Sequence, residues 1–428
     1  MKNIFKPIVV FILASFARAV VRRYRPQVVM VTGSVGKTST KDAIAAALAP
    51  NFFLRKSEKS FNSEFGVPFT ILDARNPWRN PFAWMGVIKS AVSLLLLPNH
   101  YPNMLVLEVG SEKPGNLAQI LKIVLPDIVV VTPLPDISVH VEAYASPEAV
   151  QEEEFSPAYA LPGSAPLIIP ADDAYALDNA MRTGARVISY GDARNAAVCV
   201  SDIGFYEAEG KVSGMRASVQ IDGEEGSIVV KGSVGKTQML AVAAALATAH
   251  ALHIPLAEAL ASLEDYEPPP GRGRIFAGKK GSIIIDDSYN ASPAAVEEAL
   301  ETLKTFPMRP PAGGRRIAVL GDMLELGRYS VMEHERIAAP ASAAADVIVT
   351  VGIRARAFSL GVKDSKTMQF DTARSAALAL ADFVQKGDVI LVKGSQSIRT
   401  ERVVEALLAD LADASRLVRQ EEKWKQKA

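Results

Sequence analysis

The chain has 428 residues, enough for two or three domains, and its 49% hydrophobic and 22% charged content is that of globular domains. Lysine plus arginine and aspartate plus glutamate each number 47, and a net charge of zero argues against nucleic-acid binding as the main task. The single cysteine, Cys199, excludes an internal disulfide and a thiolate metal cluster, and it fits a reducing compartment.

Residues 1–26 combine an apolar run, Ile8 to Phe16, with a basic end that contains Arg22, Arg23 and Arg25. The run is too short to span a bilayer, which takes about 20 residues. A signal peptide is disfavoured, because arginines and then a buried strand follow at once. We expect an amphipathic helix that either lies on the inner face of a membrane as a peripheral contact or packs on the protein itself.

Residues 27–270 have the pattern of a central α/β domain. Its apolar strands are expected at 27–32, 104–109, 128–132 and 167–170. Helical stretches separate these strands, which predicts a parallel sheet with helices on both faces. From about residue 196 to 230, alternating strands are broken by turn sequences, which predicts a small antiparallel appendage.

A proline-rich junction, Tyr266 to Gly271, separates this part from residues 271–428. Beyond the junction, strands are expected at 282–286, 317–320, 347–351 and 389–392. Helical stretches again lie between them, so the tail is predicted to be a second, Rossmann-like α/β domain. The fold class is therefore α/β throughout.

The sequence GSVGKT at residues 33–38 lies between a strand and a helix, as a phosphate-binding loop does, although it is two residues shorter than the usual form. Its glycines allow backbone N–H groups to surround phosphate oxygens, and the helix N-terminus favours anions. Lys37 would reach the outer phosphates and the Thr38 hydroxyl would hold Mg²⁺. The residues expected to bind nucleotide are Gly33, Ser34, Val35, Gly36, Lys37, Thr38 and Ser39.

The same six letters recur at residues 232–237, in a different context. Antiparallel strands precede this copy, and no strand ending in a carboxylate follows it. We interpret it as the start of the alanine-rich helix that follows, and not as a second nucleotide site. An internal domain duplication is the alternative, and the flanking residues do not support it.

Three further features have the chemistry of a site. Glu108 ends a strand and is either a Mg²⁺ ligand or a solvated strand end. His140, in the sequence VHVE, is either a metal ligand or a surface residue. The paired carboxylates of IIIDDSYNASP, residues 283–293, are costly unless exposed or used, and Arg272 just before them could swing onto a phosphate.

In this order, these sequences resemble the Mur ligase family from about residue 27 to the end of the chain. The matching stretches are TGSVGKTSTK (32–41), FNSEFGVPFTIL (61–72), LEVGSEKPG (107–115), HVEAYASPE (140–148), PPGRGR (269–274), DDSYNASP (286–293), LGDMLELG (320–327) and LVKGSQSIRTE (391–401). The resemblance implies a cytoplasmic ligase that uses ATP and Mg²⁺: a substrate carboxylate becomes an acyl phosphate, and an amine then forms the amide. DDSYNASP and LGDMLELG are typical of the branch that adds D-alanyl-D-alanine to a muramoyl tripeptide. A monomeric enzyme of peptidoglycan synthesis is therefore expected.

The resemblance also assigns roles to individual residues. Those implied in catalysis are Lys37, His140, Glu154 and Arg272. Those implied as Mg²⁺ ligands are Thr38, Glu108, His140 and Glu154. Further contacts to ATP are implied for Arg272, Asp287, Asn290 and His334. The substrates would meet Asn62, Ser63, Lys393, Ser395 and Glu401.

The chain departs from the family in two places. Family members carry an N-terminal domain that holds the UDP part of the substrate, whereas only about 26 residues precede the first strand here, so UDP is held otherwise or the acceptor differs. A carbamylated lysine of the family corresponds to Glu154, whose carboxylate could replace the carbamate, although a glutamate run such as 152–154 is usually a solvated face. The alternatives are a polyglutamate-type ligase and a nucleotide-binding partner protein that does not ligate.

Overall fold

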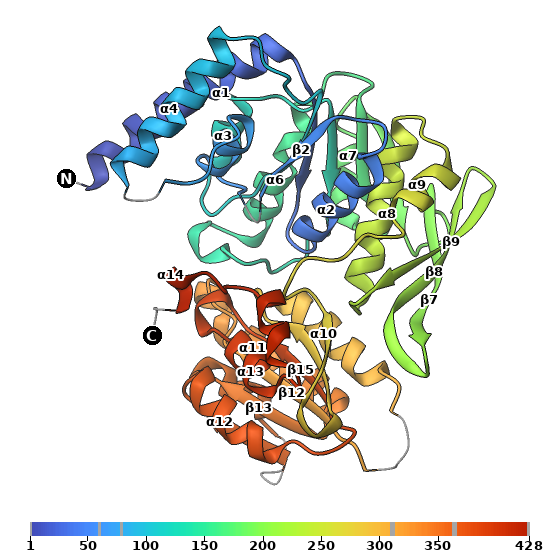
Figure 1. Ribbon diagram of the computed structural model, residues 1–428. Helices are drawn as coiled ribbons and strands as arrows, with labels where there is room; N and C mark the ends of the chain where they lie inside the picture. The colour runs from blue at the N-terminus through green and yellow to red at the C-terminus, as the bar shows by residue number, and fades with distance from the viewer. Residues whose placement is uncertain (1, 59–60, 78–79, 309–312, 362–365, 426–428) are drawn as a thin grey trace.

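The computed structural model describes every residue except 1, 59–60, 78–79, 309–312, 362–365 and 426–428. Two α/β units follow each other along the chain, and each is built on its own sheet (Figure 1). The strands of the first unit are β1 (Gln27–Thr32), β2 (Leu54–Lys56), β3 (Met104–Glu108), β4 (Ile128–Val131), β5 (Pro166–Pro170), β6 (Arg186–Gly191), β7 (Val198–Ala208), β8 (Lys211–Ile221) and β9 (Glu224–Lys231). The strands of the second are β10 (Arg274–Ala277), β11 (Ile283–Asp287), β12 (Arg316–Gly321), β13 (Val347–Val351), β14 (Thr367–Phe370) and β15 (Val389–Lys393).

The first sheet has the order β2-β3-β1-β4-β5-β6-β7-β8-β9. Pairs from β2 to β7 are parallel, and β7, β8 and β9 pair antiparallel. The expected parallel sheet is confirmed. The antiparallel strands are also confirmed, and they continue the same sheet because β6 pairs with β7.

Helices cover both faces of this sheet, as the fully buried strands β3 and β4 require. On one face, α2 (Lys37–Leu48) and α8 (Lys236–Ala251) share a core with Val29, Val106 and Val130. On the other face, Met30, Leu107 and neighbouring residues pack under α1 (Lys2–Tyr24) and α4 (Pro81–Leu96). The remaining helices of this unit are α3 (Gly66–Ile71), α5 (Asn116–Leu121), α6 (Pro147–Tyr159), α7 (Ala174–Ala180) and α9 (Leu256–Ser262).

The second sheet has the order β10-β11-β15-β12-β13-β14, and only β10 runs antiparallel to its neighbour. Its helices are α10 (Pro293–Thr305), α11 (Ser330–Ala344), α12 (Ala373–Phe383), α13 (Glu401–Leu407) and α14 (Glu422–Lys425). The parallel strands separated by helices agree with the expected Rossmann-like unit. The first strand of the second sheet, β10, begins at Arg274, and we therefore propose that the two domains are residues 27–270 and 271–428.

The N-terminal segment forms a helix, as expected, and α1 buries its inner face on the protein through Leu13, Ala17 and Val20. The helix α4 beside it was not predicted from the sequence. Within the described residues, no helix has the length and apolarity to cross a bilayer.

Candidate active site

The phosphate loop connects β1 to α2 and depends on two glycines with positive φ. Gly33 has a φ of 110°, and a Cβ atom there would lie 2.3 Å from the carbonyl oxygen of Thr132. Gly36 has a φ of 86° and is the N-cap residue of α2. Because an L side chain would clash at the first position and be strained at both, the loop shape requires glycine there.

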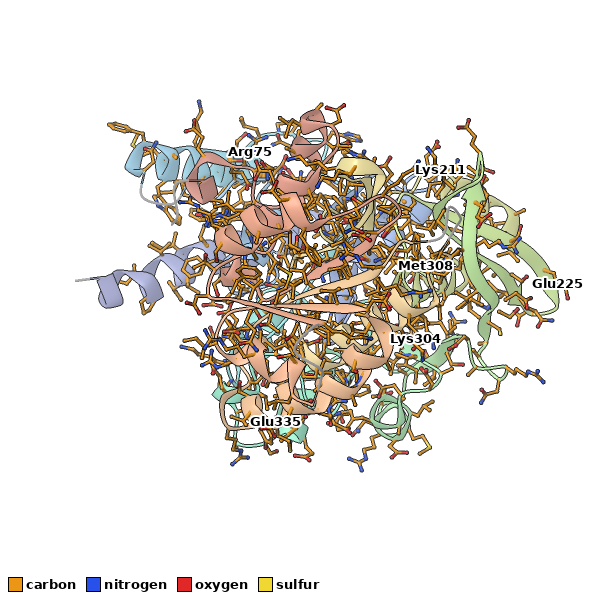
Figure 2. The ribbon with its side chains drawn as sticks, turned by 90° about the horizontal axis from the view of Figure 1, so that it is seen from below. Arg75, Lys211, Glu225, Lys304, Met308 and Glu335 are labelled. Carbon is orange, nitrogen blue, oxygen red and sulfur yellow. The ribbon has the colours of Figure 1, made fainter. Side chains whose placement is uncertain are left out.

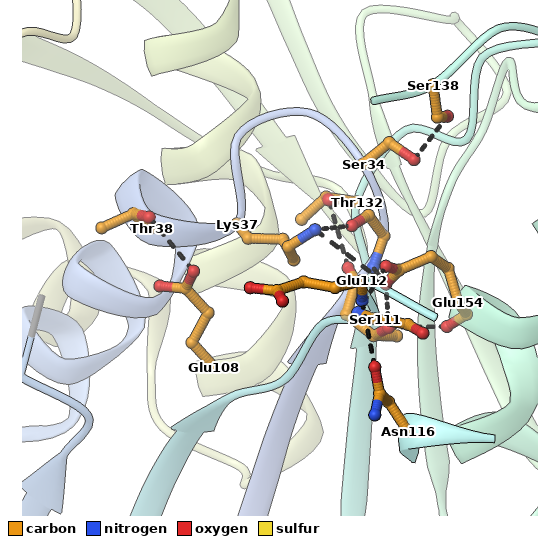
Figure 3. Close-up of polar contacts among 12 residues, drawn as sticks. Ser34, Lys37, Thr38, Glu108, Ser111, Glu112, Asn116, Thr132, Ser138 and Glu154 are labelled. Atoms are coloured by element: carbon orange, nitrogen blue, oxygen red, sulfur yellow. Dashed lines mark hydrogen bonds and ion pairs between the residues drawn. The ribbon is translucent and has the colours of Figure 1, made fainter. Parts of the chain in front are cut away.

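Lys37 and Thr38 begin α2 and point into the space beyond the strands (Figure 3). The Lys37 ammonium donates to the carbonyl oxygen of Gly33 and lies 3.9 Å from a carboxylate oxygen of Glu154. The Thr38 hydroxyl donates to Oε1 of Glu108 at 3.3 Å, and an Arg272 nitrogen lies 3.4 Å from the same hydroxyl. Cations from both units of the fold therefore converge at the start of α2.

Glu108, at the carboxyl end of β3, is only 2% exposed. Burial raises the pKa of this carboxyl group, and the charges of Lys41, Lys37 and Arg272 oppose that rise. Its Oε2 is buried without a hydrogen-bond partner among the described residues. The Lys41 ammonium lies 4.0 Å from this oxygen. A carboxylate oxygen with no hydrogen-bond donor, next to a threonine hydroxyl, fits a hard divalent cation, because Mg²⁺ prefers oxygen ligands.

Glu154, on α6, contacts the phosphate loop through one carboxylate oxygen and the segment after β3 through the other (Figure 3). Its Oε2 accepts a hydrogen bond from the Gly33 N–H at 3.2 Å and lies 3.0 Å from the Thr32 hydroxyl, whose one proton is shared with the Glu154 carbonyl oxygen at 2.6 Å. Its Oε1 accepts from the Ser111 N–H at 3.0 Å. The run 152–154 is therefore not a solvated face at this position: Glu154 is 3% exposed and joins the loop to the segment after β3.

A cleft of about 520 Å³ lies between the phosphate loop and the second unit. It brings together many of the residues predicted from the sequence: Ser34, Val35, Gly36, Lys37, Thr38, Asn62, Glu108, His140, Arg272, Asn290, Lys393 and Ser395. Arg272 lies over the ring of Tyr289, with 4.2 Å between the guanidinium carbon and the ring centroid. Lys393 is 3% exposed and donates to Asp287 Oδ2 at 2.6 Å and to the Asn290 carbonyl at 3.1 Å.

His140 joins the two units on one side of the cleft. Its Nδ1 lies 2.7 Å from Oε2 of Glu325, which follows β12. The hydrogen bond from His140 lowers the pKa of the Glu325 carboxyl group, against the effect of burial. His140 has a φ of 68°, so the backbone turns sharply where it presents the ring.

The second GSVGKT segment lies at the junction between the units and starts α8, as predicted. It is preceded by β9, an antiparallel strand. Here the Glu298 carboxylate accepts hydrogen bonds from the Thr237 N–H at 2.8 Å and from the Thr237 hydroxyl. The anion at this helix N-terminus is thus the carboxylate of Glu298 on α10. The segment therefore contacts the second unit, at the place where a phosphate-binding loop would contact a phosphate.

The family model described as Mur ligase middle domain matches residues 31–249, and the one described as Mur ligase, glutamate ligase domain, matches residues 271–396. The chain belongs to the Mur ligase family.

Curated relatives in this family carry the name UDP-N-acetylmuramoyl-tripeptide–D-alanyl-D-alanine ligase. The Mycobacterium bovis protein is 27% identical, over 90% of this chain and 73% of its own length. The Escherichia coli protein is 28% identical, over 89% of this chain and 76% of its own length. A crystal structure of MurF ligase from Thermotoga maritima in complex with ADP has a TM-score of 0.75 and 26% identity, covering 93% of this chain and 83% of that one.

Seven residues predicted from the Mur ligase resemblance or from the phosphate loop do not line the main cleft. They are Gly33, Ser39, Ser63, Glu154, Asp287, His334 and Glu401. Ser63 accepts a hydrogen bond from the Gly66 N–H at 3.4 Å, at the start of α3. Glu401 pairs with Arg399 and, at 2.9 Å, with Arg419, so it acts on the cleft only through its neighbours. Their roles toward ligands remain predictions.

His334 is buried on α11, where both ring nitrogens are used. The Met323 N–H donates to its Nε2 at 3.0 Å, so the ring proton is on Nδ1, 2.6 Å from the Ser330 carbonyl. Burial lowers the pKa of this imidazole, which fits the neutral form. His334 faces a separate cavity of about 290 Å³ beside Glu325 and holds the segment after β12.

Sequence reasoning missed three charged residues of the cleft, Glu112, Glu325 and Arg399. Each lies within a stretch that resembles the family, so its position near a residue with an assigned role could have indicated that it belongs to the site. Glu112 extends toward the space between Lys37 and Glu108 (Figure 3).

Among the described residues, no three His, Cys, Asp or Glu side chains gather as a metal cluster. A Mg²⁺ that keeps waters and phosphate oxygens needs only one or two protein ligands.

Proposed function

We propose that this chain is an ATP-dependent ligase that joins D-alanyl-D-alanine to a muramoyl tripeptide. The observation that carries the proposal is the shared cleft, in which Lys37 of the phosphate loop faces Arg272 and Lys393 from the junction and second unit. The names of the curated relatives supply the substrate class. Ligation through an acyl phosphate brings several negative oxygens together, and such a cluster of cations would stabilise them.

In this proposal the phosphates lie over the loop from Gly33 to Thr38, with backbone N–H groups and the N-terminus of α2 directed at them. Lys37 would leave the Gly33 carbonyl and meet the γ-phosphate, and Arg272 would approach from the junction. Thr38 and Glu108 would hold Mg²⁺, which when bound neutralises phosphate charge. The MurF ligase from Thermotoga maritima, solved in complex with ADP, is consistent with this nucleotide.

The reaction would proceed in two balanced steps. A substrate carboxylate oxygen attacks the γ-phosphorus, and ADP leaves with the electrons of the broken P–O bond. The dipeptide amine then attacks the acyl carbon and loses a proton, and phosphate leaves with the electrons of the C–O bond. Lys393, Ser395 and Arg399 line the side of the cleft that would receive the dipeptide, and Asn62 lies on the acceptor side.

The proposal also includes His140 and Glu154 as ligands of Mg²⁺. His140 would hold a second Mg²⁺ through Nε2, since its Nδ1 is engaged by Glu325. Glu154 would ligate Mg²⁺ only if it releases the loop donors described above. We further propose a monomer in the cytoplasm, with residues 1–26 able to contact the inner face of a membrane.

The test is ADP release by the full-length protein with ATP, Mg²⁺, UDP-muramoyl tripeptide and D-alanyl-D-alanine, with the product identified by mass. We expect release to require both the tripeptide and the dipeptide, and to vanish in Lys37→Ala. Release that requires glutamate and a glutamyl acceptor would establish the polyglutamate-type ligase instead. Tight nucleotide binding with no substrate-dependent release would establish a partner protein without ligation.

A further inference from the structure

The helix α4 presents an apolar stripe to the outside. Phe82, Met85 and Leu96 are 80%, 66% and 74% exposed, and Ile88 and Val92 continue the stripe between them at helical spacing. The opposite face is already buried in the core, through Val87 and Ala91. A helix that buries one apolar face and exposes another has more apolar surface than its fold needs.

The helix α1 adds a second exposed stripe beside the first. Ile8, Phe11 and Ile12 are exposed, while its inner residues enter the same core cluster as those of α4. The Tyr24 hydroxyl donates to the Leu94 carbonyl at 2.7 Å, which joins the C-terminal ends of the two helices. Both helices extend past the sheets in two perpendicular views (Figures 1 and 2). Because they share one core beneath them, their exposed stripes face away from it together.

A basic cavity of about 850 Å³ lies at the C-terminal end of α1. Arg18, Arg22, Arg25 and Lys122 line it, and none of the four forms an ion pair with a described residue. One carboxylate, Asp127, lines it as well, and its Oδ2 accepts a hydrogen bond from the Val28 N–H at 2.8 Å, so the lining keeps an excess of positive charge. The Nε of Arg18 is buried without a hydrogen-bond partner among those residues. Arg18 and Arg22 follow Phe11 at helical spacing, so the apolar stripe of α1 continues into the basic cavity.

The charge of this surface decides which occupant fits it. Residues 1–41 and 74–107, which include both helices, contain no aspartate or glutamate. A second copy of the chain would bring the same positive charge against it, whereas an anionic lipid surface is complementary. Apolar side chains beside basic ones are also the arrangement by which helices lie in a lipid interface.

We propose that α1 and α4 together form a docking surface for an anionic phospholipid bilayer. The two apolar stripes enter the headgroup–acyl boundary, and the basic cavity receives a lipid phosphate. This goes beyond contact through residues 1–26, because α4 supplies the most exposed side chains. The cavity borders the amino end of β1 at Gln27, whereas the phosphate loop follows its carboxyl end, so docking leaves the cleft open and does not depend on the ligase reaction.

The experiment is sedimentation of the full-length protein with vesicles of phosphatidylcholine alone or of phosphatidylcholine with phosphatidylglycerol at three to one. The test variant is Phe82→Ser/Met85→Ser/Leu96→Ser. The matched control is Ile353→Ser/Leu378→Ser/Leu411→Ser, whose residues are 75%, 71% and 72% exposed on the second unit. All six positions are on the surface, so both variants should fold, and thermal melting checks this.

We expect the α4 variant to lower partition onto anionic vesicles by at least about tenfold, since each lost side chain removes apolar area from the interface. The control should bind within about twofold of the wild type. Arg18→Gln/Arg22→Gln should weaken binding to anionic vesicles and leave the weak binding to neutral ones unchanged. ADP release in solution should be the same for all three.

Equal binding by the α4 variant and the control would overturn the docking surface. Equal binding of the wild type to neutral and anionic vesicles would overturn the role of the basic cavity. A wild type that is dimeric without lipid, together with a monomeric α4 variant, would show instead that the surface joins two copies of the chain.

Discussion

Replacing Glu154 by glutamine should loosen the phosphate loop, because this carboxylate accepts hydrogen bonds from the Gly33 and Ser111 N–H groups and also contacts the Thr32 hydroxyl. An amide can turn its oxygen to the Thr32 hydroxyl and the Gly33 N–H, but its NH₂ group then faces the Ser111 N–H. A buried donor left without an acceptor costs about 1–3 kcal/mol. We therefore expect Glu154→Gln to lower the free energy of unfolding by about 2 kcal/mol. Glu152→Gln, at an exposed position of the same helix, should change it by less than about 0.5 kcal/mol.

The assay is urea denaturation of both variants, paired with ADP affinity and with the Mg²⁺ dependence of ADP release. Glu154→Gln should lower the unfolding midpoint and weaken ADP binding even without Mg²⁺, because the loop itself is less ordered. Equal unfolding midpoints and equal ADP affinities for the two variants would refute the reasoning. A higher Mg²⁺ requirement with unchanged stability would support the metal-ligand role of Glu154 in its place. Bicarbonate should have no effect on either variant, since no carbamate has to form.

Three more experiments test other parts of the molecule. Lys37→Ala should abolish ATP turnover, whereas Lys236→Ala should leave ATP affinity within a few-fold, because Lys236 pairs with Asp192 at the surface and the adjacent helix start holds Glu298. Solution scattering should show compaction with an ATP analogue and substrates, as the second unit closes on the phosphate loop; an unchanged radius of gyration would contradict closure. Burial raises the pKa of Asp286 to about 6, so the native state binds the extra proton between pH 4 and 6 and stability falls as pH rises through that window. Asp286→Asn should remove that fall, and an unchanged profile of unfolding against pH would contradict it.

Truncation of residues 1–26 would change the stability of the protein as well as its binding to a membrane. Leu13, Ala17 and Val20 are buried in the core of the first unit, so removing α1 would expose that core. We expect a chain that begins near Arg25 to be destabilised, which melting temperature would reveal. Surface substitutions on α4 separate location from stability, because the side chains that they change do not enter the core.

The sequence by itself determined the features that depend on neighbouring residues. The phosphate loop could be found because Gly33 and Gly36 permit backbone angles that other residues rarely adopt, and a buried strand precedes them. The apolar runs of β1, β3 and β4 predicted a parallel sheet, because strands covered on both faces must be apolar throughout. Short or partly exposed strands such as β2 and β14 were not predicted, since their pattern is weak.

Only the tertiary structure decided which partners those features meet. Two identical GSVGKT segments have opposite surroundings, because one opens on a cleft while the other receives the Glu298 carboxylate from α10. Glu154 could be counted among three glutamates in the sequence, but its contact with Gly33, 121 residues away, appears only in the fold. The exposed face of α4 likewise follows from which of its sides the core already covers. Local backbone preferences are encoded within a few residues, whereas burial and pairing depend on chain segments that only folding brings together.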